Sequence, residues 1–98
     1  MSLSNIFLEM KRRAGETGED RATDLRGGAR LAVRVRADVI TLTISRKEKA
    51  LGATEIETFK RDCGVPAGAE RLPDVGQRVR LRDGAQWHTI TYRWREDQ

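Results

Sequence analysis

Cys63 and His88 are the residues whose types could support nucleophilic catalysis, and each is the only one of its kind in the 98-residue chain. A Cys–His pair is active only when further groups orient the histidine and stabilise an oxyanion. The sequence around Cys63 offers no such groups. Zinc needs three or four ligands from cysteine, histidine or carboxylate. One cysteine and one histidine are too few for such a site. We therefore predict a non-enzymatic protein with no catalytic residue, no metal site and no cofactor.

Two other patterns could bear chemistry, and a simpler interpretation fits each of them. Glu55 and Glu57 stand two residues apart, about 7 Å along a strand. Acid–base catalysis by such a pair needs unequal burial of the two carboxyl groups, and a solvated strand face is the favoured interpretation. Gly27 and Gly28 lack the strand-to-helix context of a phosphate-binding loop, so they indicate a linker.

The candidate binding surface is an arginine-rich stretch near the end of the chain. Its members are Arg78, Arg80, Arg82, Trp87, Arg93 and Arg95. Guanidinium groups can hold phosphates or carboxylates, and a tryptophan can stack on a base or on a protein loop. A third interpretation is a solvated face that keeps an edge strand soluble. Aromatic residues are only 5% of the chain, which favours protein partners over nucleic acid.

Length and composition limit the class of protein. A chain of 98 residues with a formal net charge of +4 is long enough for one domain with a modest core. A single cysteine excludes an internal disulfide and favours a reducing, cytoplasmic setting. We find no secretory signal, and no apolar run approaches the roughly 20 residues that span a bilayer, so no membrane association is expected.

Residues 3–13 are expected to form a short N-terminal helix. Leu3, Ile6, Phe7 and Met10 recur at helical spacing and would share one face. A helix of about three turns is marginal alone in water, so this stripe must pack on something. Residues 14–28 lack apolar periodicity and are expected to be a flexible linker. We expect Ile6, Phe7 and Met10 to dock on a neighbouring subunit, with docking on the protein's own sheet as the alternative.

The rest of the chain, 29–98, is expected to be a mainly β domain. Residues 29–36 and 39–46 alternate as a hairpin, and 54–62 alternate as a further strand. Residues 63–76 carry both prolines and are expected to be an irregular loop. Asp83-Gly84 separates two alternating runs and is a strong hairpin signal. These elements predict a small antiparallel, partly closed β-barrel of about five strands with a short N-terminal helix.

Buried and exposed faces can be assigned in the last hairpin. Ile90, Tyr92 and Trp94 alternate with Thr91 and Arg93, so the three apolar residues should face the core. Trp87 falls on the polar side of the same strand.

The segments ETFKRDCGVP (57–66) and RLPDVGQRVRLRDGAQWHTITYRW (71–94) resemble small structural proteins of tailed phages and prophages, of the head–tail joining or head-closure group. The likeness rests on a phenylalanine, a loop, a Pro-x-x-Gly-x-x-Val strand, an Asp-Gly turn and an aromatic that opens the next strand. The positions are Phe59, Pro73, Gly76, Val79, Gly84, Trp87 and Ile90. The resemblance implies a β-barrel adaptor without catalysis that forms rings with its own copies between portal or connector and tail. The N-terminal half departs from this pattern.

The expected function is therefore that of a phage or prophage virion structural protein, a head–tail joining or tail-completion adaptor. It would act through contacts with itself, as a homo-oligomer, and with neighbouring virion proteins. It would occupy the bacterial cytoplasm during assembly and then the virion. The alternative is a small β-barrel that binds nucleic acid through the arginine-rich hairpin.

Overall fold

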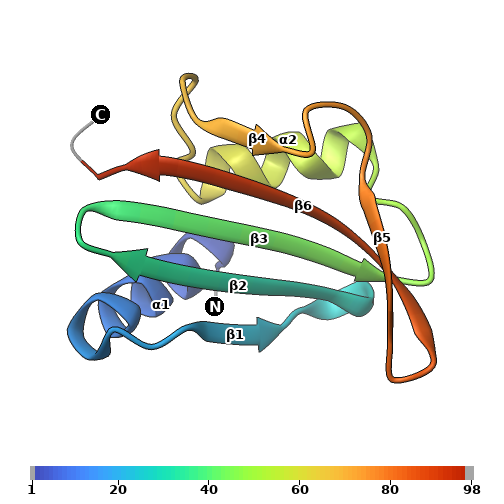
Figure 1. The fold of residues 1–98 in the computed structure, drawn as a ribbon, viewed down its shortest axis with the longest axis horizontal. Coiled ribbons are helices and arrows are strands. Elements are labelled where there is room, and N and C mark those ends of the chain that lie inside the picture. Colours follow the sequence, from blue (N-terminus) through green and yellow to red (C-terminus); the bar gives the residue numbers. More distant parts are fainter. Residues whose placement is uncertain (1, 97–98) are drawn as a thin grey trace.

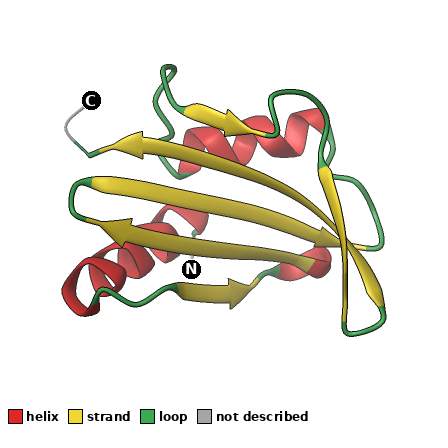
Figure 2. Cartoon of the chain, viewed as in Figure 1, coloured by secondary structure: helices red, strands yellow, loops and turns green. Residues whose placement is uncertain are grey.

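The structure, a computed structural model, describes residues 2–96 and consists of one antiparallel sheet with two α-helices on the same face (Figures 1 and 2). The elements in chain order are α1 (Leu3–Thr17), β1 (Arg21–Asp24), the 3-10 turn η1 (Arg26–Gly28), β2 (Ala29–Arg36), β3 (Val39–Lys47), α2 (Ala53–Asp62), β4 (Glu70–Leu72), β5 (Arg78–Arg82) and β6 (Ala85–Arg95). The mainly β fold with an N-terminal helix is the one that the sequence predicts.

The strand order is β1-β2-β3-β6-β4, and β5 pairs with β6 off this path. β4 and β5 therefore follow one another along the same edge of β6, opposite its residues 91–93 and 85–89. Figure 1 shows β5 crossing the end of the sheet as the long β6 bends. The sheet has six strands, one more than expected, and it does not close. The barrel is thus only partial.

The core lies between the sheet and the helices. Alternate residues of the central strands supply it: Leu31 and Val33 from β2, Ile40, Leu42 and Ile44 from β3, and Ile90, Tyr92 and Trp94 from β6. Each of these side chains is less than a tenth exposed. The predicted inward face of the last strand is therefore confirmed.

Helix α1 packs on the sheet of its own chain. The Ser2 hydroxyl accepts a hydrogen bond from the Asn5 N–H at 3.2 Å and caps the helix. Phe7 and Met10 are buried in the core, and the ring centroid of Phe7 lies 6.3 Å from that of Trp94. The arrangement is thus the alternative one, with the apolar stripe on the protein's own sheet. A neighbouring subunit could contact Phe7 and Met10 only if α1 left that sheet.

The predicted strand at 54–62 is wrong, because these residues form helix α2. Ile56 and Phe59 stand three residues apart, which places them on one face of a helix but on opposite faces of a strand. The Glu55 carboxylate accepts a hydrogen bond from the Gly52 N–H at 3.3 Å and closes the first turn. Glu55 also pairs with Arg46 of β3, which ties the helix to the sheet. The Glu55–Glu57 pair on a strand face does not exist.

The expected linker at 14–28 has regular structure. α1 continues to Thr17, and Gly18 ends it with a φ of 72°. β1 then pairs with β2, and the Asp20 carboxylate holds Arg34 and Arg36 of β2 at 2.8 and 3.3 Å. A hydrogen bond from Arg34 lowers the pKa of Asp20. Residues 63–76, expected to be irregular throughout, likewise contain β4.

The turn between β5 and β6 is confirmed as predicted. Asp83 and Gly84 have φ values of 52° and 76°, the left-handed pair that a two-residue hairpin requires. Every residue of β5 is nevertheless exposed, including Val79 at 51% and Leu81 at 78%. The hairpin therefore contributes one strand to the core and leaves the other outside it.

Trp94→Ala is expected to lower the free energy of unfolding by about 3–5 kcal/mol, because it opens a large cavity in the core. Urea denaturation would measure the loss, with Gln86→Ala on the exposed part of the same strand as the control. A Trp94→Ala shift no larger than that of Gln86→Ala would contradict the assignment of the buried face.

The contact between α1 and β6 can be tested by a double-mutant cycle with Phe7→Leu and Trp94→Leu. A coupling free energy of about 0.5–1.5 kcal/mol is expected for this ring pair. The coupling free energy should be the same at low and high protein concentration, since both rings belong to one chain. A coupling free energy that disappears on dilution would instead place α1 on a neighbouring subunit.

Candidate functional site

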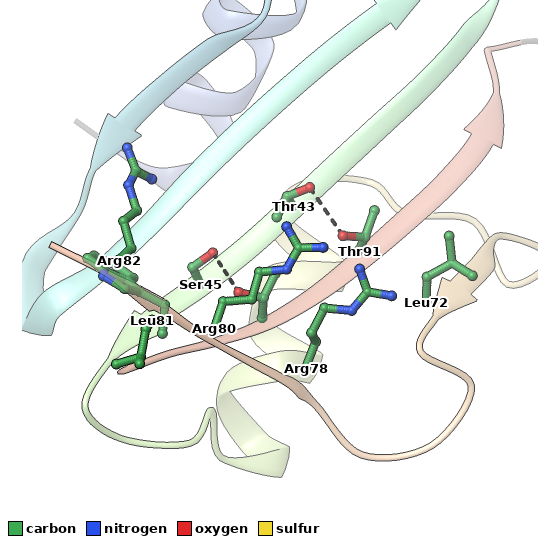
Figure 3. Close-up of a pocket in the computed structure, with 10 residues that line it drawn as sticks. Thr43, Ser45, Leu72, Arg78, Arg80, Leu81, Arg82 and Thr91 are labelled. Atoms are coloured by element: carbon green, nitrogen blue, oxygen red, sulfur yellow. Dashed lines mark hydrogen bonds between the residues drawn. The ribbon is translucent and has the colours of Figure 1, made fainter. Parts of the chain in front are cut away.

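A groove of about 480 Å³ lies on the polar face of the sheet, opposite the helices, where β5 bends over that face (Figure 3). Its lining residues are Thr43, Ser45, Leu72, Arg78, Arg80, Leu81, Arg82, Trp87, Thr89 and Thr91. They come from β3, β4, β5 and β6. This list contains three arginines and no carboxylate, so the groove is strongly positive.

Hydroxyl groups form the floor of the groove. β3 and β6 pair in register, so Thr43 lies beside Thr91 and Ser45 lies beside Thr89. Each pair shares a side-chain hydrogen bond of 3.2 Å. Each hydroxyl keeps further hydrogen-bonding capacity after this bond. The floor can therefore donate a hydrogen bond to a bound anion while the hydrogen bond within each hydroxyl pair is kept.

Arg78, Arg80 and Arg82 form the wall of the groove. Figure 3 shows Arg78 and Arg80 extending from β5 toward Thr43 and Thr91, whereas Arg82 points away toward the neighbouring strands. Within residues 2–96, neither Arg78 nor Arg80 has a carboxylate within ion-pair distance, and Arg82 has only Asp83, at 4.0 Å. Side chains of this kind keep their full charge available for a ligand.

The other two arginines predicted to share this surface lie elsewhere. Arg93 donates to the Glu70 carboxylate at 2.7 Å, which links β6 to β4. Arg95 pairs with Asp38 at 3.2 Å, at the turn between β2 and β3. The five predicted arginines therefore do not form one surface. Three line the groove from β5, and the other two form ion pairs that join the C-terminal half of β6 to β4 and to the β2–β3 turn.

Trp87 lies on the polar face, as its parity in the sequence predicts. It is opposite Arg80 on β5 and Lys47 on β3. It also lines a second hollow of about 350 Å³ together with Arg82 and Lys47. The two hollows share Trp87 and Arg82, so they adjoin and form a track across the end of the sheet in which cations outnumber carboxylates.

The remaining predicted binding residues belong to α1, which packs on the core face of the sheet, whereas the groove lies on the polar face. Phe7 and Met10 are buried in the core, and Ile6 is partly buried against it. The structure therefore does not bring the helix stripe and the arginines into one surface.

Two side chains that the sequence did not indicate hold β5 in place. The Arg71 guanidinium donates to the backbone carbonyl oxygens of Pro73, Asp74 and Gly76 at 2.8–2.9 Å and closes the loop before β5. The Gln77 amide accepts from the Leu51 N–H at 2.9 Å and donates to its carbonyl oxygen at 2.7 Å. The Arg71 contacts are local and the Gln77 contact spans 26 residues, and neither residue belongs to a recognisable motif.

Cys63, one of the two residues considered for nucleophilic chemistry, is not poised for attack. Cys63 is buried at the end of α2, and burial, with a smaller effect of the Asp62 charge, raises the pKa of its thiol to about 12. The thiolate needed for attack is therefore almost absent at neutral pH. Among residues 2–96, no cluster of three histidine, cysteine or carboxylate side chains could hold a metal ion.

Comparison with protein-family models, curated protein sequences and solved structures finds no match to this chain. Neither helix in the described part of the chain has the length and apolar character needed to span a bilayer.

Cys63 is expected to resist a thiol reagent such as a disulfide dye at pH 8 in the folded protein and to react fully once urea unfolds it. The physical reason is that burial both covers the sulfur and keeps it protonated. Absorbance of the released dye would measure the two rates. Rapid labelling without urea would contradict the buried, protonated state.

Proposed function

We propose that this protein is a non-enzymatic structural adaptor that acts through contacts with copies of itself and with neighbouring proteins, as a head–tail joining or tail-completion protein of a tailed phage or prophage. The observation that carries the proposal is strand β5, which is exposed along its whole length and has hydrogen-bonding partners on one edge only. A strand in this state is a ready template for another chain.

Apolar exposure supports the same proposal. Val79 and Leu81 alternate with the arginines of β5, and Val75 in the preceding loop is 86% exposed. Isolated exposed apolar residues are ordinary, but three of them on one projecting segment mark a surface that a partner covers. β5 adds no buried side chain to the core of its own chain, so its apolar side chains are free to contact a partner.

The phage resemblance concerns this same segment. Gly76 and Gly84 stand at positive φ, 74° and 76°, so both glycines of the motif meet a backbone requirement where β5 begins and ends. Val79 lies on the strand between them. The motif thus describes how the projecting strand is built, which is consistent with a family whose function is assembly. An adaptor of this kind would accumulate in the bacterial cytoplasm during assembly and end in the virion.

The self-association part of the proposal can be tested with Leu81→Lys. The wild-type protein is expected to form oligomers at high concentration, and a lysine on the edge strand should weaken them at least about tenfold, because it adds charge to the contact. Light scattering after size-exclusion chromatography would measure the mass. Leu8→Lys is the matched control, since Leu8 is 53% exposed but lies on α1.

Two results would contradict the proposal. One is a wild-type protein that stays monomeric at all accessible concentrations; the other is an equal loss of mass in the Leu8 and Leu81 variants. The virion part has its own test in the neighbouring genes. Portal, capsid and tail genes on either side would support it, and a setting among metabolic genes would contradict it.

A further inference from the structure

The positive groove has three properties that occur together at no other described surface of the chain. It has a wall of arginines without strong ion pairs, a floor of hydroxyl groups and a partly exposed tryptophan. Most other arginines of the sheet are paired with carboxylates: Arg30 with Asp24, Arg34 and Arg36 with Asp20, Arg46 with Glu55, Arg93 with Glu70 and Arg95 with Asp38. Arg21 of β1 bonds to a hydroxyl and Arg71 of β4 to backbone carbonyls instead. The cations left for a ligand are therefore concentrated on β5.

The charge pattern selects an anionic ligand. Guanidinium groups form paired hydrogen bonds with phosphate oxygens, and serine and threonine hydroxyls add neutral donors to the same oxygens. Arg78 and Arg80 extend over the Thr43–Thr91 pair (Figure 3). A phosphate placed between them would meet donors from both the wall and the floor.

The shape of the site selects a linear ligand. Arg82 and Trp87 line both the main groove and the second hollow, where Lys47 adds another cation. The carboxylates of that second hollow are Asp24, which is paired with Arg30, and Asp83, which lies 4.0 Å from Arg82. A track in which cations outnumber carboxylates suits a polymer with repeated negative charges better than a single small anion.

Trp87 distinguishes between the polyanions that could follow this track. It lies opposite Arg80 on the polar face, among the cations. An indole ring beside arginines is a stacking platform for an unpaired base. The bases of a duplex are already stacked and paired, and an acidic peptide would use the arginines without needing an aromatic surface.

We infer that the groove between β5 and the polar face of the sheet binds single-stranded nucleic acid, with phosphates on Arg78 and Arg80 and a base on Trp87. This function goes beyond the assembly contacts proposed above, which use the free edge and the apolar side chains of β5; of these side chains, Leu81 also lines the groove. Oligomeric mass is measured without nucleic acid, and the arginine and tryptophan variants test the affinity, so either proposal can fail while the other stands.

The test uses the full chain and a fluorescein-labelled oligothymidylate of about 12 nucleotides, within the range of common single-strand binding sites. Fluorescence anisotropy should show salt-sensitive binding. Replacing Arg78 and Arg80 with Gln is expected to weaken it at least about tenfold and to reduce the slope of log K against log salt by about 1.4, from roughly 0.7 per lost phosphate contact. Arg93→Gln is the matched control, since that arginine is paired outside the groove, and its affinity should equal that of the wild type.

Trp87→Leu tests the stacking step, because leucine keeps an apolar side chain but removes the ring. It is expected to weaken oligothymidylate binding by about tenfold or more. Binding should also quench tryptophan emission in the wild type and not in this variant, since Trp94 is buried on the other face. Circular dichroism would verify that each variant is folded.

Three results would overturn the inference. The first is absence of salt-sensitive binding to the oligonucleotide. The second is equal affinity for a duplex of the same length together with wild-type affinity in Trp87→Leu, which would mean general attraction to phosphates. The third is tighter binding of a glutamate-rich peptide of equal charge, which would assign the groove to an acidic protein segment.

Discussion

The pairing of β3 with β6 is the constraint on which the rest of the structure depends. Nine residue pairs run from Val39–Arg95 to Lys47–Trp87, and successive side chains point to opposite faces. One register therefore places Ile44 beside Ile90 in the core and Thr43 beside Thr91 on the open face. A slip of one residue would expose the apolar set and bury the hydroxyls. The core and the floor of the groove are thus two consequences of the same alignment.

The second constraint concerns the outer edge of β6, which β4 and β5 divide between them. The loop between these two strands must leave the sheet and return to it, and its backbone carbonyls need partners when it does so. Arg71 supplies three hydrogen bonds to that loop, and Gln77 fixes its end to Leu51. β5 therefore has a defined direction although it buries none of its own side chains. This direction brings its arginines over the hydroxyl floor.

Much of this arrangement follows from the local pattern of apolar and polar residues. The predictions that were wrong have physical causes. Strict alternation predicted β2, β3, β5 and β6, because a sheet with one buried face imposes that period. Alternation also predicted a strand at 54–62, where the three-residue spacing of Ile56 and Phe59 is the period of the helix that forms. β1 escaped notice because ion pairs to Asp20, rather than apolar side chains, help to hold it on β2. For the site, parity placed Trp87 on the polar face. It could not show which arginines had acidic partners, because those partners, Glu70 and Asp38, are distant in sequence.

The two proposed roles of β5 are compatible because they use different groups of the same strand. Alternation separates Val79 from the arginines, and the free edge offers backbone groups rather than side chains. A neighbouring chain that paired with this edge would continue the sheet beyond β5 and leave the arginine wall facing the hydroxyl floor. It would also bring a second wall of the same charge beside the first, if the neighbour were another copy. Like charges in that position repel one another, and a bound polyanion would remove the repulsion. Assembly through β5 and occupation of the groove would therefore strengthen each other.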